Sequence, residues 1–222
     1  LHCHTYHSDG KHSPEHMLKR AKEIGLHALA ITDHNTLNGV RHLHEDKVYE
    51  EYGLKFIRGF ELSLNSGHFL ILGGKQEKTP HILKKFKVID GANRHKHKKR
   101  EIKEILEEFN NIGSAIIAAH PSFLKIPLCV ESEILLDLYA RGLVHGAEEH
   151  NNDLRRHLKQ PVYGVWHRHV HKLLKSQGIP CFANSDAHRH KDLGKHKNFI
   201  EVEDDCWDIV EIIKSKKHKG NK

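Results

Sequence analysis

Apolar and polar positions alternate along the chain with two different periods, which separate short strands from longer helices. Short apolar runs predict buried β-strands at residues 27–32, 54–64, 68–74, 114–120, 143–151, 179–188 and 198–203. Stretches with apolar residues three and four positions apart predict amphipathic helices at residues 13–25, 39–53, 98–113, 131–142, 163–178 and 205–217. This alternation predicts an α/β fold with a mainly parallel sheet.

The stretch at residues 13–25 shows how such a helix is delimited. Ser13 can accept a hydrogen bond from a free backbone N–H of the first turn, and Pro14 suits the first helical position. Apolar residues then recur on one face until Gly25, which ends the helix. The local sequence therefore predicts both ends of this element.

Length and composition describe one globular domain that spans residues 1–222. Hydrophobic residues make up 37% and charged residues 29%, enough for a sizeable core beneath a strongly solvated surface. No apolar run approaches the roughly 20 residues that a membrane-spanning helix needs, so we expect no membrane partner. Because Leu1 already lies inside a candidate motif, we expect a few residues to precede it in the natural protein.

The formal net charge of +7 predicts a surface that attracts polyanions or phosphorylated small molecules. Much of the positive excess lies in two basic segments, residues 94–100 and 214–222. Each segment can hold phosphate groups, and each can equally be a solvated helix face or a frayed end. The charge favours a phosphorylated substrate without identifying one.

The cysteines exclude two kinds of site. They are scattered, with no CxxC pair, at Cys3, Cys129, Cys181 and Cys206. This spacing argues against a zinc ribbon and against a dithiol redox centre, and it fits a reduced, cytoplasmic setting. Cys3 lies between His2 and His4 on an expected strand, so its side chain should point to the opposite face and pack there.

Residues able to bind metal gather where the predicted strands end. They are His2 and His4 on a first strand, Asp33 and His34 after 27–32, Glu61 after the start of 54–64, His120 after 114–119, and Asp186 and His188 after 179–184. Because the carboxyl ends of parallel barrel strands meet on one face, these side chains should converge. Imidazole and carboxylate without thiolate suit zinc, manganese or iron. So many ligands exceed what one ion needs, and we expect two or three divalent ions bridged by a carboxylate such as Glu61.

Four motifs in this order resemble those of the PHP family, named for polymerase and histidinol phosphatase. They are "HCHTYHSDG", "ITDHNTLNG", "AAHPS" and "NSDAH", and "GFELS" with "GHFLILG" resembles the Glu-bearing strand and the strand after it. The resemblance implies a distorted (β/α)7 barrel with a multinuclear metal site at the C-terminal ends of its strands. It also implies hydrolysis of phosphate esters.

Carried over position by position, the resemblance implies a set of metal ligands: His2, His4, Asp9, His34, Glu61, His120, Asp186 and His188. His68 is a further candidate, with a loop histidine near the site as its alternative. Asp9 enters only through the resemblance, because nothing in its own spacing marks it. We interpret the remaining histidines, including those of "HRHVH" at 167–171, as surface residues.

The expected reaction is metal-assisted hydrolysis of a phosphomonoester or phosphodiester. Asp186 or His188 could accept the proton of the attacking water, and loss of His34 should abolish turnover. Guanidinium groups can grip a phosphate through two parallel hydrogen bonds. The candidates for that contact are Arg94, Arg100, Arg155 and Arg189, whose alternative is a solvated surface position.

Three functional hypotheses remain open. A hydrolase would act on a nucleotide, a short oligonucleotide end or another small phosphorylated metabolite, with no obligate protein partner. A non-catalytic PHP module in nucleic-acid processing is the main alternative, although all eight matching ligand positions are present. The 24 histidines prompt a third hypothesis, a passive metal-storage protein. This hypothesis predicts that many metal ions bind loosely to each chain.

Overall fold

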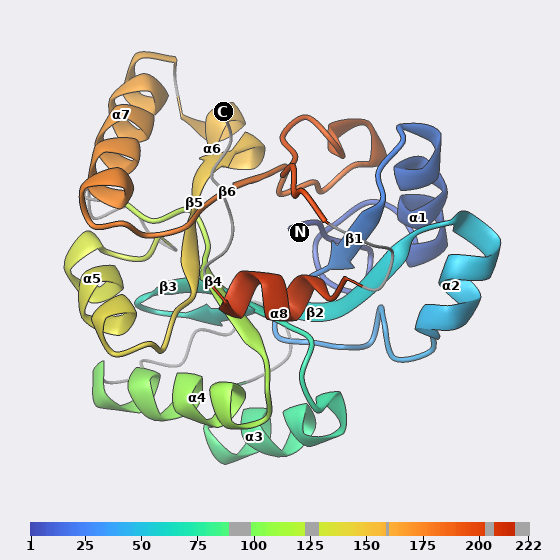
Figure 1. Cartoon of the computed structure of the whole chain (residues 1–222), viewed down its shortest axis with the longest axis horizontal. Coiled ribbons are helices and arrows are strands. Elements are labelled where there is room, and N and C mark those ends of the chain that lie inside the picture. Colours follow the sequence, from blue (N-terminus) through green and yellow to red (C-terminus); the bar gives the residue numbers. More distant parts are fainter. Residues whose placement is uncertain (89–98, 123–128, 159, 203–206, 216–222) are drawn as a thin grey trace.

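The computed structural model describes residues 1–88, 99–122, 129–158, 160–202 and 207–215. Six strands form one curled sheet in the order β1 to β6: β1 (Ala28–Ile31), β2 (Lys55–Leu64), β3 (Gly67–Leu72), β4 (Ala115–Ala118), β5 (Gly146–Asn151) and β6 (Cys181–Asn184). The helices are α1 (Pro14–Glu23), α2 (Glu45–Tyr52), η1 (Gln76–Lys78), α3 (Thr79–Lys85), α4 (Lys99–Asn111), α5 (Ser132–Ala140), α6 (Asn152–His157), α7 (Gln160–Ser176), η2 (His190–Asp192) and α8 (Ile209–Lys214). The helices surround the sheet (Figure 1).

The sheet is parallel except around β3, which runs antiparallel to both β2 and β4. Leu64 pairs with Gly67, so only two residues join β2 to β3, and a link that short can connect only antiparallel strands. The sheet is therefore mainly parallel, as expected, and this hairpin introduces its antiparallel strand. One consequence is that the first residues of β3 lie beside the end of β2.

The N-terminal segment lies between the two edges of the sheet. His4 N–H donates to the carbonyl of Ala187 after β6 at 3.0 Å, and Thr32 N–H after β1 donates to the carbonyl of Cys3 at 2.8 Å. This extended segment makes an isolated bridge at Cys3 rather than a strand. The described residues therefore form six strands, with the segment at residues 1–5 in the remaining gap of the ring; the expected count of seven strands is not reached.

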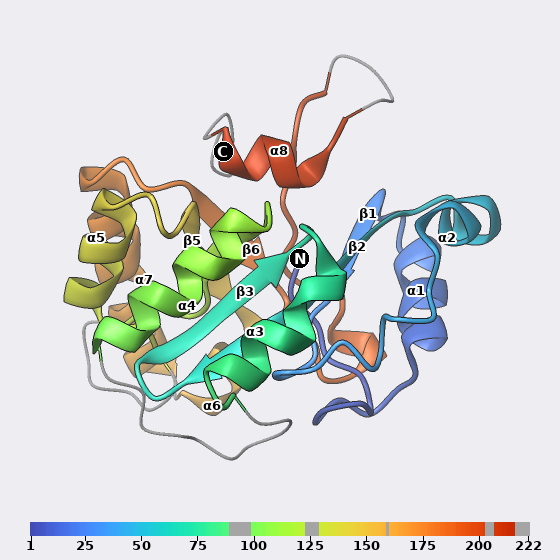
Figure 2. The same cartoon turned by 90° about the horizontal axis from the view of Figure 1, so that it is seen from below.

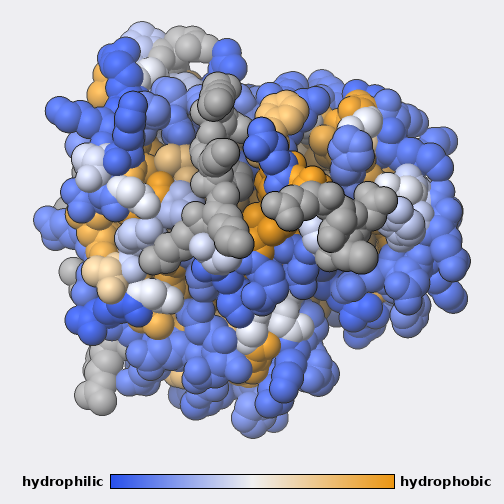
Figure 3. All heavy atoms as spheres, in the orientation of Figure 1, coloured by the Kyte–Doolittle hydropathy of each residue, from blue (hydrophilic) through white to orange (hydrophobic). Residues whose placement is uncertain are grey.

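Two apolar regions enclose the sheet. Outside it, helices cover the strands, α1 and α2 beside β1 and α3, α4, α5 and α7 beside the other strands (Figures 1 and 2). Inside it, Ile57, Leu70 and Phe182 from three strands pack with Ile209 and Ile213 of α8. Helix α8 closes this end of the sheet, and the polar residues of the candidate site lie toward the other end. The surface in this orientation is mostly hydrophilic (Figure 3), as the charged fraction predicts.

Most predicted elements are present, with three corrections. Helix α1 begins after Ser13, whose side chain accepts from His16 N–H, as predicted. The helix expected at 39–53 starts only at Glu45, because residues 37–43 form turns that bury Val40. Helices α3 and α6 were not expected.

The strand expected at 198–203 is absent from its described part, residues 198–202. The side chain of Asn198 takes the place of a neighbouring strand instead. Its amide accepts from Ala183 N–H at 2.9 Å and donates to the Ala183 carbonyl at 3.1 Å, which satisfies the edge of β6.

None of the helices in the described ranges is both long and apolar enough to cross a bilayer.

Candidate metal centre

Nine side chains that the sequence pointed to lie together on the inside of the sheet. They come from the N-terminal segment (His2, His4, Asp9), the turn after β1 (His34), β2 (Glu61), β3 (His68), the turn after β4 (His120) and the turn after β6 (Asp186, His188). Six of the nine are buried, whereas the Asp9 side chain is 53% exposed. The cluster therefore has a buried interior and one open edge.

Glu61 lies at the middle of this cluster. Its Oε2 is 2.9 Å from His34 Nδ1 and 3.4 Å from the Nε2 atoms of both His2 and His4. Its other oxygen, Oε1, accepts from His68 Nδ1 at 2.9 Å. Because β3 is antiparallel to β2, His68 at the start of β3 reaches Glu61 directly, so it is a strand residue at the centre rather than a loop histidine beside it.

His120 reaches the same carboxylate through an unusual backbone. Its Nε2 lies 3.3 Å from Glu61 Oε1. The preceding Ala119 faces the inner apolar cluster, so continued extension would turn His120 outward. Instead His120 has φ of 30°, and Asp186 has φ of 46°, both in the left-handed region that non-glycine residues rarely adopt. Such strain is typical of functional sites and here aims two polar side chains inward.

His2, His4 and Asp186 form a compact triangle of donor atoms. The two Nε2 atoms are 3.1 Å apart, and they lie 3.2 Å and 3.1 Å from Asp186 Oδ1. That oxygen is buried and accepts no hydrogen bond of good geometry within the described residues. Ligand atoms around a tetrahedral zinc ion are about 3.3 Å apart, given Zn–N distances of roughly 2.0–2.1 Å. The triangle therefore fits a divalent cation better than it fits a hydrogen-bond network.

Two further groups of donor atoms adjoin this triangle. His4, Asp9, His34 and His188 form one group, and His34, Glu61 and His68 form the other. Since His4 belongs to two groups and His34 to two, the three groups are continuous. The residues could hold up to three ions in a row, with nitrogen and oxygen ligands and no thiolate.

Asp33 does not join these donors, although the sequence placed it among the metal-capable residues. Its carboxylate accepts from Thr5 N–H at 2.7 Å, Thr5 Oγ1 at 2.6 Å and Ser8 Oγ at 2.7 Å. It therefore ties down the turn that carries Asp9.

Sequence reasoning missed Glu148 on β5, which is fully buried. Its Oε1 accepts from His2 Nδ1 at 2.8 Å, and its Oε2 accepts from the backbone N–H of His120 at 2.9 Å. With Nδ1 protonated, His2 presents the lone pair of Nε2 to the centre, as metal-binding histidines commonly do. Asn151 donates to both Glu148 and Asp186. The sequence signal that could have indicated Glu148 was the pair of adjacent glutamates, Glu148 and Glu149, in a strand that is otherwise predicted to be buried.

Carboxylates and imidazoles shift each other's pKa in this cluster. Burial alone would raise the pKa of Glu61, but the imidazoles of His68, His2 and His34 hold it well below its usual range. In the same way, histidines outweigh burial and keep the pKa of Asp186 and of Asp9 below the usual range. The carboxylates are therefore ionised across the physiological range. Their charge in turn outweighs burial and raises the pKa of His34 to about 10 and that of His188 to about 9.

The structure describes the side chains of two of the four candidate phosphate-binding arginines. Arg189 is half-buried and directly follows His188, and Arg155 is exposed on α6, one turn after Asn151. Arg94 and the side chain of Arg100 lie outside the described residues. Arg189 therefore adjoins the open edge of the cluster in sequence, and Arg155 lies on the helix that follows β5.

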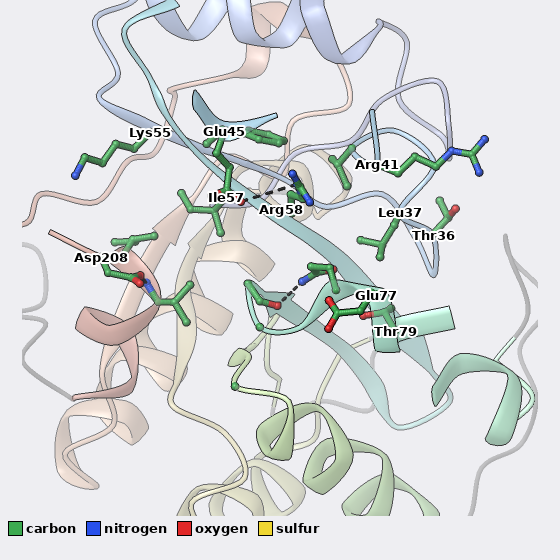
Figure 4. A pocket seen from close by; sticks show the side chains of 18 of the residues that line it. Thr36, Leu37, Arg41, Glu45, Lys55, Ile57, Arg58, Glu77, Thr79 and Asp208 are labelled. Atoms are coloured by element: carbon green, nitrogen blue, oxygen red, sulfur yellow. Dashed lines mark hydrogen bonds and ion pairs between the residues drawn. The ribbon is translucent and has the colours of Figure 1, made fainter. Parts of the chain in front are cut away.

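A large pocket lies away from this centre. Its volume is about 1240 Å³, and its lining comes from the segment after β1, from α2, β2 and η1, and from α8 (Figure 4). Arg58 there faces Glu45 at 3.9 Å. None of the nine clustered residues lines it.

Sequence comparisons match part of the chain to two curated proteins. Over short segments the chain resembles an error-prone DNA polymerase of Cutibacterium acnes (47% identity over 66 residues) and a 5'-3' exoribonuclease of Haemophilus influenzae (38% over 65 residues). Each match covers 29% of this chain, but only 6% and 23% of those proteins.

Solved structures share the fold over most of the chain. A two-domain protein of Bacteroides vulgatus that contains a predicted PHP-like metal-dependent phosphoesterase matches with a TM-score of 0.59 and 20% identity, over 86% of this chain and 51% of that one. The lesion-specific endonuclease PfuEndoQ of Pyrococcus furiosus matches with a TM-score of 0.63 and 21% identity, over 97% and 55%.

The family models divide the chain. Residues 1–163 match the PHP domain, and residues 164–217 match a region described as PHP-associated. The first match contains seven of the nine clustered side chains and every strand of the sheet except β6. Because this match covers most of the chain and contains three of the four motifs, "HCHTYHSDG", "ITDHNTLNG" and "AAHPS", the chain belongs to the PHP domain family.

Proposed function

We propose that this protein is a metal-dependent phosphoesterase that holds two or three divalent ions, Mn, Zn or Fe, in the cluster around Glu61. The observation that carries the proposal is the continuity of the three donor groups, which share His4 and His34. A row of adjacent ions suits phosphate esters, whose oxygens are charged on several sides. The ligands proposed are His2, His4, Asp9, His34, Glu61, His68, His120, Asp186 and His188.

When bound, the ions would lower the pKa of an attacking water and neutralise charge on the phosphoryl oxygens. The protein's own residues supply position and proton transfer. His188 donates from Nδ1 to the Asp186 carbonyl at 3.1 Å, which leaves Nε2 facing Asp9 Oδ2 at 3.2 Å. This pair lies at the exposed edge, where a substrate can enter and where a proton can leave to solvent. We therefore assign His188, with Asp186 and His34, to the reacting end of the centre.

The substrate proposed is a phosphate ester of a nucleotide, of a short oligonucleotide end or of another small phosphorylated metabolite. Support comes from the net charge of +7, from Arg189 beside His188 and from Arg155 near Asn151. The named activities of the exoribonuclease and of the endonuclease point in the same direction. Salt-sensitive binding of oligonucleotides is expected, because contacts to phosphates release counterions.

The test compares His34→Ala with His27→Ala. Both residues flank β1, but His34 lies in the cluster and His27 is exposed at the other end of the strand. Phosphate release is measured on p-nitrophenyl phosphate, a nucleoside 3',5'-bisphosphate, histidinol phosphate and a short 5'-phosphorylated RNA. We expect turnover of at least one by the wild type and by His27→Ala, and none by a folded His34→Ala.

Elemental analysis of the same samples separates the alternatives. Two or three ions per chain together with turnover support the phosphoesterase. Unchanged turnover in His34→Ala contradicts the assigned centre. Tightly bound ions without turnover of any substrate, even with added manganese, would favour the non-catalytic module.

A further inference from the structure

A second cluster of metal-binding side chains lies on the outer face of the sheet, between β5 and α7. Glu149 and His150 come from β5, and His167 and His171 come from the helix that packs beside it (Figure 1). His167 and His171 are one helical turn apart and therefore share a face of α7. The sequence analysis had interpreted these helix histidines as surface residues, but His167 is half-buried against His150.

An irregularity in β5 places the first two residues together. The register between β5 and β6 shifts between Glu148 and His150. Glu148 and Asn151 both contact the inner centre, so the extra residue of this β-bulge puts Glu149 and His150 on the outer side. A regular strand would alternate, and His150 would then face inward with Glu148.

The donor atoms have the spacing of a metal site. His150 Nε2 lies 3.2 Å from His167 Nε2, and Glu149 Oε1 lies 3.6 Å from His167 Nε2 and 4.0 Å from His150 Nε2. Ligand atoms around tetrahedral zinc are about 3.3 Å apart, so small side-chain movements bring all three into range. His171 donates from Nδ1 to Glu149 Oε1, as a residue that orients a ligating carboxylate would.

His196 supplies a second, independent observation. Its ring stacks on the ring of His150 at 5.2 Å between centroids. Its Nε2 is buried and has no hydrogen-bond partner within the part of the chain that the structure describes. A half-buried imidazole with an unpartnered nitrogen therefore borders the group at His150.

The imidazoles are also in the form that binds metal. Burial, and after it the neighbouring His167, lower the pKa of His150 to about 4. Burial likewise lowers the pKa of His167. At neutral pH both rings therefore carry free lone pairs, and Glu149 supplies a carboxylate to the group.

We propose that Glu149, His150 and His167 bind one divalent transition-metal ion of the zinc type on the outer face of β5. His171 orients the carboxylate, and His196 lies against the site. The ligand set of one carboxylate and two imidazoles favours zinc over magnesium or calcium. The ion would join α7 to β5, on the face of the strand opposite to Glu148 and the inner centre.

The test counts zinc in five proteins after chelator treatment, reloading with Zn²⁺ and dialysis: wild type, His167→Ala, His169→Ala, His4→Ala and the double variant of His4→Ala with His167→Ala. His169 is the matched control, since it is an exposed histidine on the same helix. We expect His167→Ala to bind one zinc fewer than the wild type and His169→Ala to bind the same number. His4→Ala should lose zinc only from the inner centre, and in the double variant the two losses should add.

Equal zinc counts in the wild type and His167→Ala would overturn the proposal, and so would non-additive losses, which would place His167 in the inner centre. If His167→Ala fails to fold by circular dichroism, Glu149→Gln replaces it, with the same expected loss of one ion. The result is independent of turnover on phosphate esters. A failed phosphoesterase assay therefore leaves this site standing, and a failed zinc count leaves the phosphoesterase standing.

Discussion

The inner centre and the outer cluster use the same side chains, histidine and carboxylate, but they are assembled differently. The inner centre draws on six separate segments of the chain and exists only when the sheet curls and the N-terminal segment lies between its edges. The outer cluster draws on β5 and α7 alone. The inner donors form a continuous row suited to several ions, whereas the outer donors form one group. The comparison suggests chemistry inside the sheet and stabilisation outside it.

The largest effect should come from Glu61→Gln, which removes the charge at the middle of the inner centre and keeps the shape. Five histidines lie within 3.4 Å of this carboxylate. Bridged ions contribute several kcal/mol to stabilising a phosphoryl transition state, so hydrolysis should fall on the order of 10³-fold. Steady-state kinetics and metal counts measure this loss.

Glu133→Gln is the control for that change. Glu133 is an exposed glutamate on α5 that belongs to neither cluster, and it receives the same substitution. Its kinetics should match the wild type. A folded Glu61→Gln that keeps its metals and its rate would show that the inner centre is not the site of reaction.

Much of the inner cluster could be predicted from the sequence because its candidate ligands lie in short local motifs. His2 and His4 at spacing two, and Asp186 and His188 at spacing two, each mark one turn or extended segment. The capping residue Ser13 predicted the start of α1 in the same local way. Signals of this kind depend on a few neighbouring residues, and the fold preserves them.

What the sequence could not provide depends on partners far along the chain. Glu148 holds His2, which lies 146 positions away, and nothing local marks it as different from Glu149. The bulge that turns His150 to the same side as Glu149 lies in the pairing with β6. Asn198 likewise takes the place of a strand by pairing with Ala183. The antiparallel direction of β3, by contrast, follows locally from the two-residue link to β2.

Asn151→Ala should have the next largest effect, because Asn151 supports the inner centre from the bulged strand. Its amide donates to Glu148 Oε2 at 2.9 Å and to Asp186 Oδ2 at 3.0 Å. Removing such support commonly costs roughly 10- to 100-fold in metal affinity. Its side chain also caps α6 through Leu154 N–H, so about 1 kcal/mol of stability should be lost as well.

Asn152→Ala is the matched control. Asn152 directly follows Asn151 and is also buried, but the amide nitrogen of Asn152 has no hydrogen-bond partner within the described residues. Competition with a coloured chelator gives the metal affinity of both variants. Equal affinities would mean that Asn151 acts only as a helix cap.

The smallest effect should come from Trp166→Phe, at the point where the two regions approach each other. Trp166 is buried on α7 next to His167, and its indole N–H donates at 2.7 Å to the carbonyl of Pro121, the residue after His120. The variant leaves that carbonyl unsatisfied, which costs about 1–3 kcal/mol of unfolding free energy. The contact helps to hold the left-handed backbone of His120. One positioning contact is worth about 1.4 kcal/mol or less, so we expect turnover to change by less than about tenfold.

Urea unfolding measures the stability of the Trp166→Phe variant, and steady-state kinetics measure its turnover. Trp207→Phe is the control and should leave turnover unchanged, because Trp207 is a partly buried tryptophan beside α8. A loss of stability without any change in turnover would show that α7 and its outer cluster stabilise the fold without affecting the inner centre. A loss of turnover as large as that of Glu61→Gln would make α7 part of the catalytic assembly. The distinction between the two regions would then disappear.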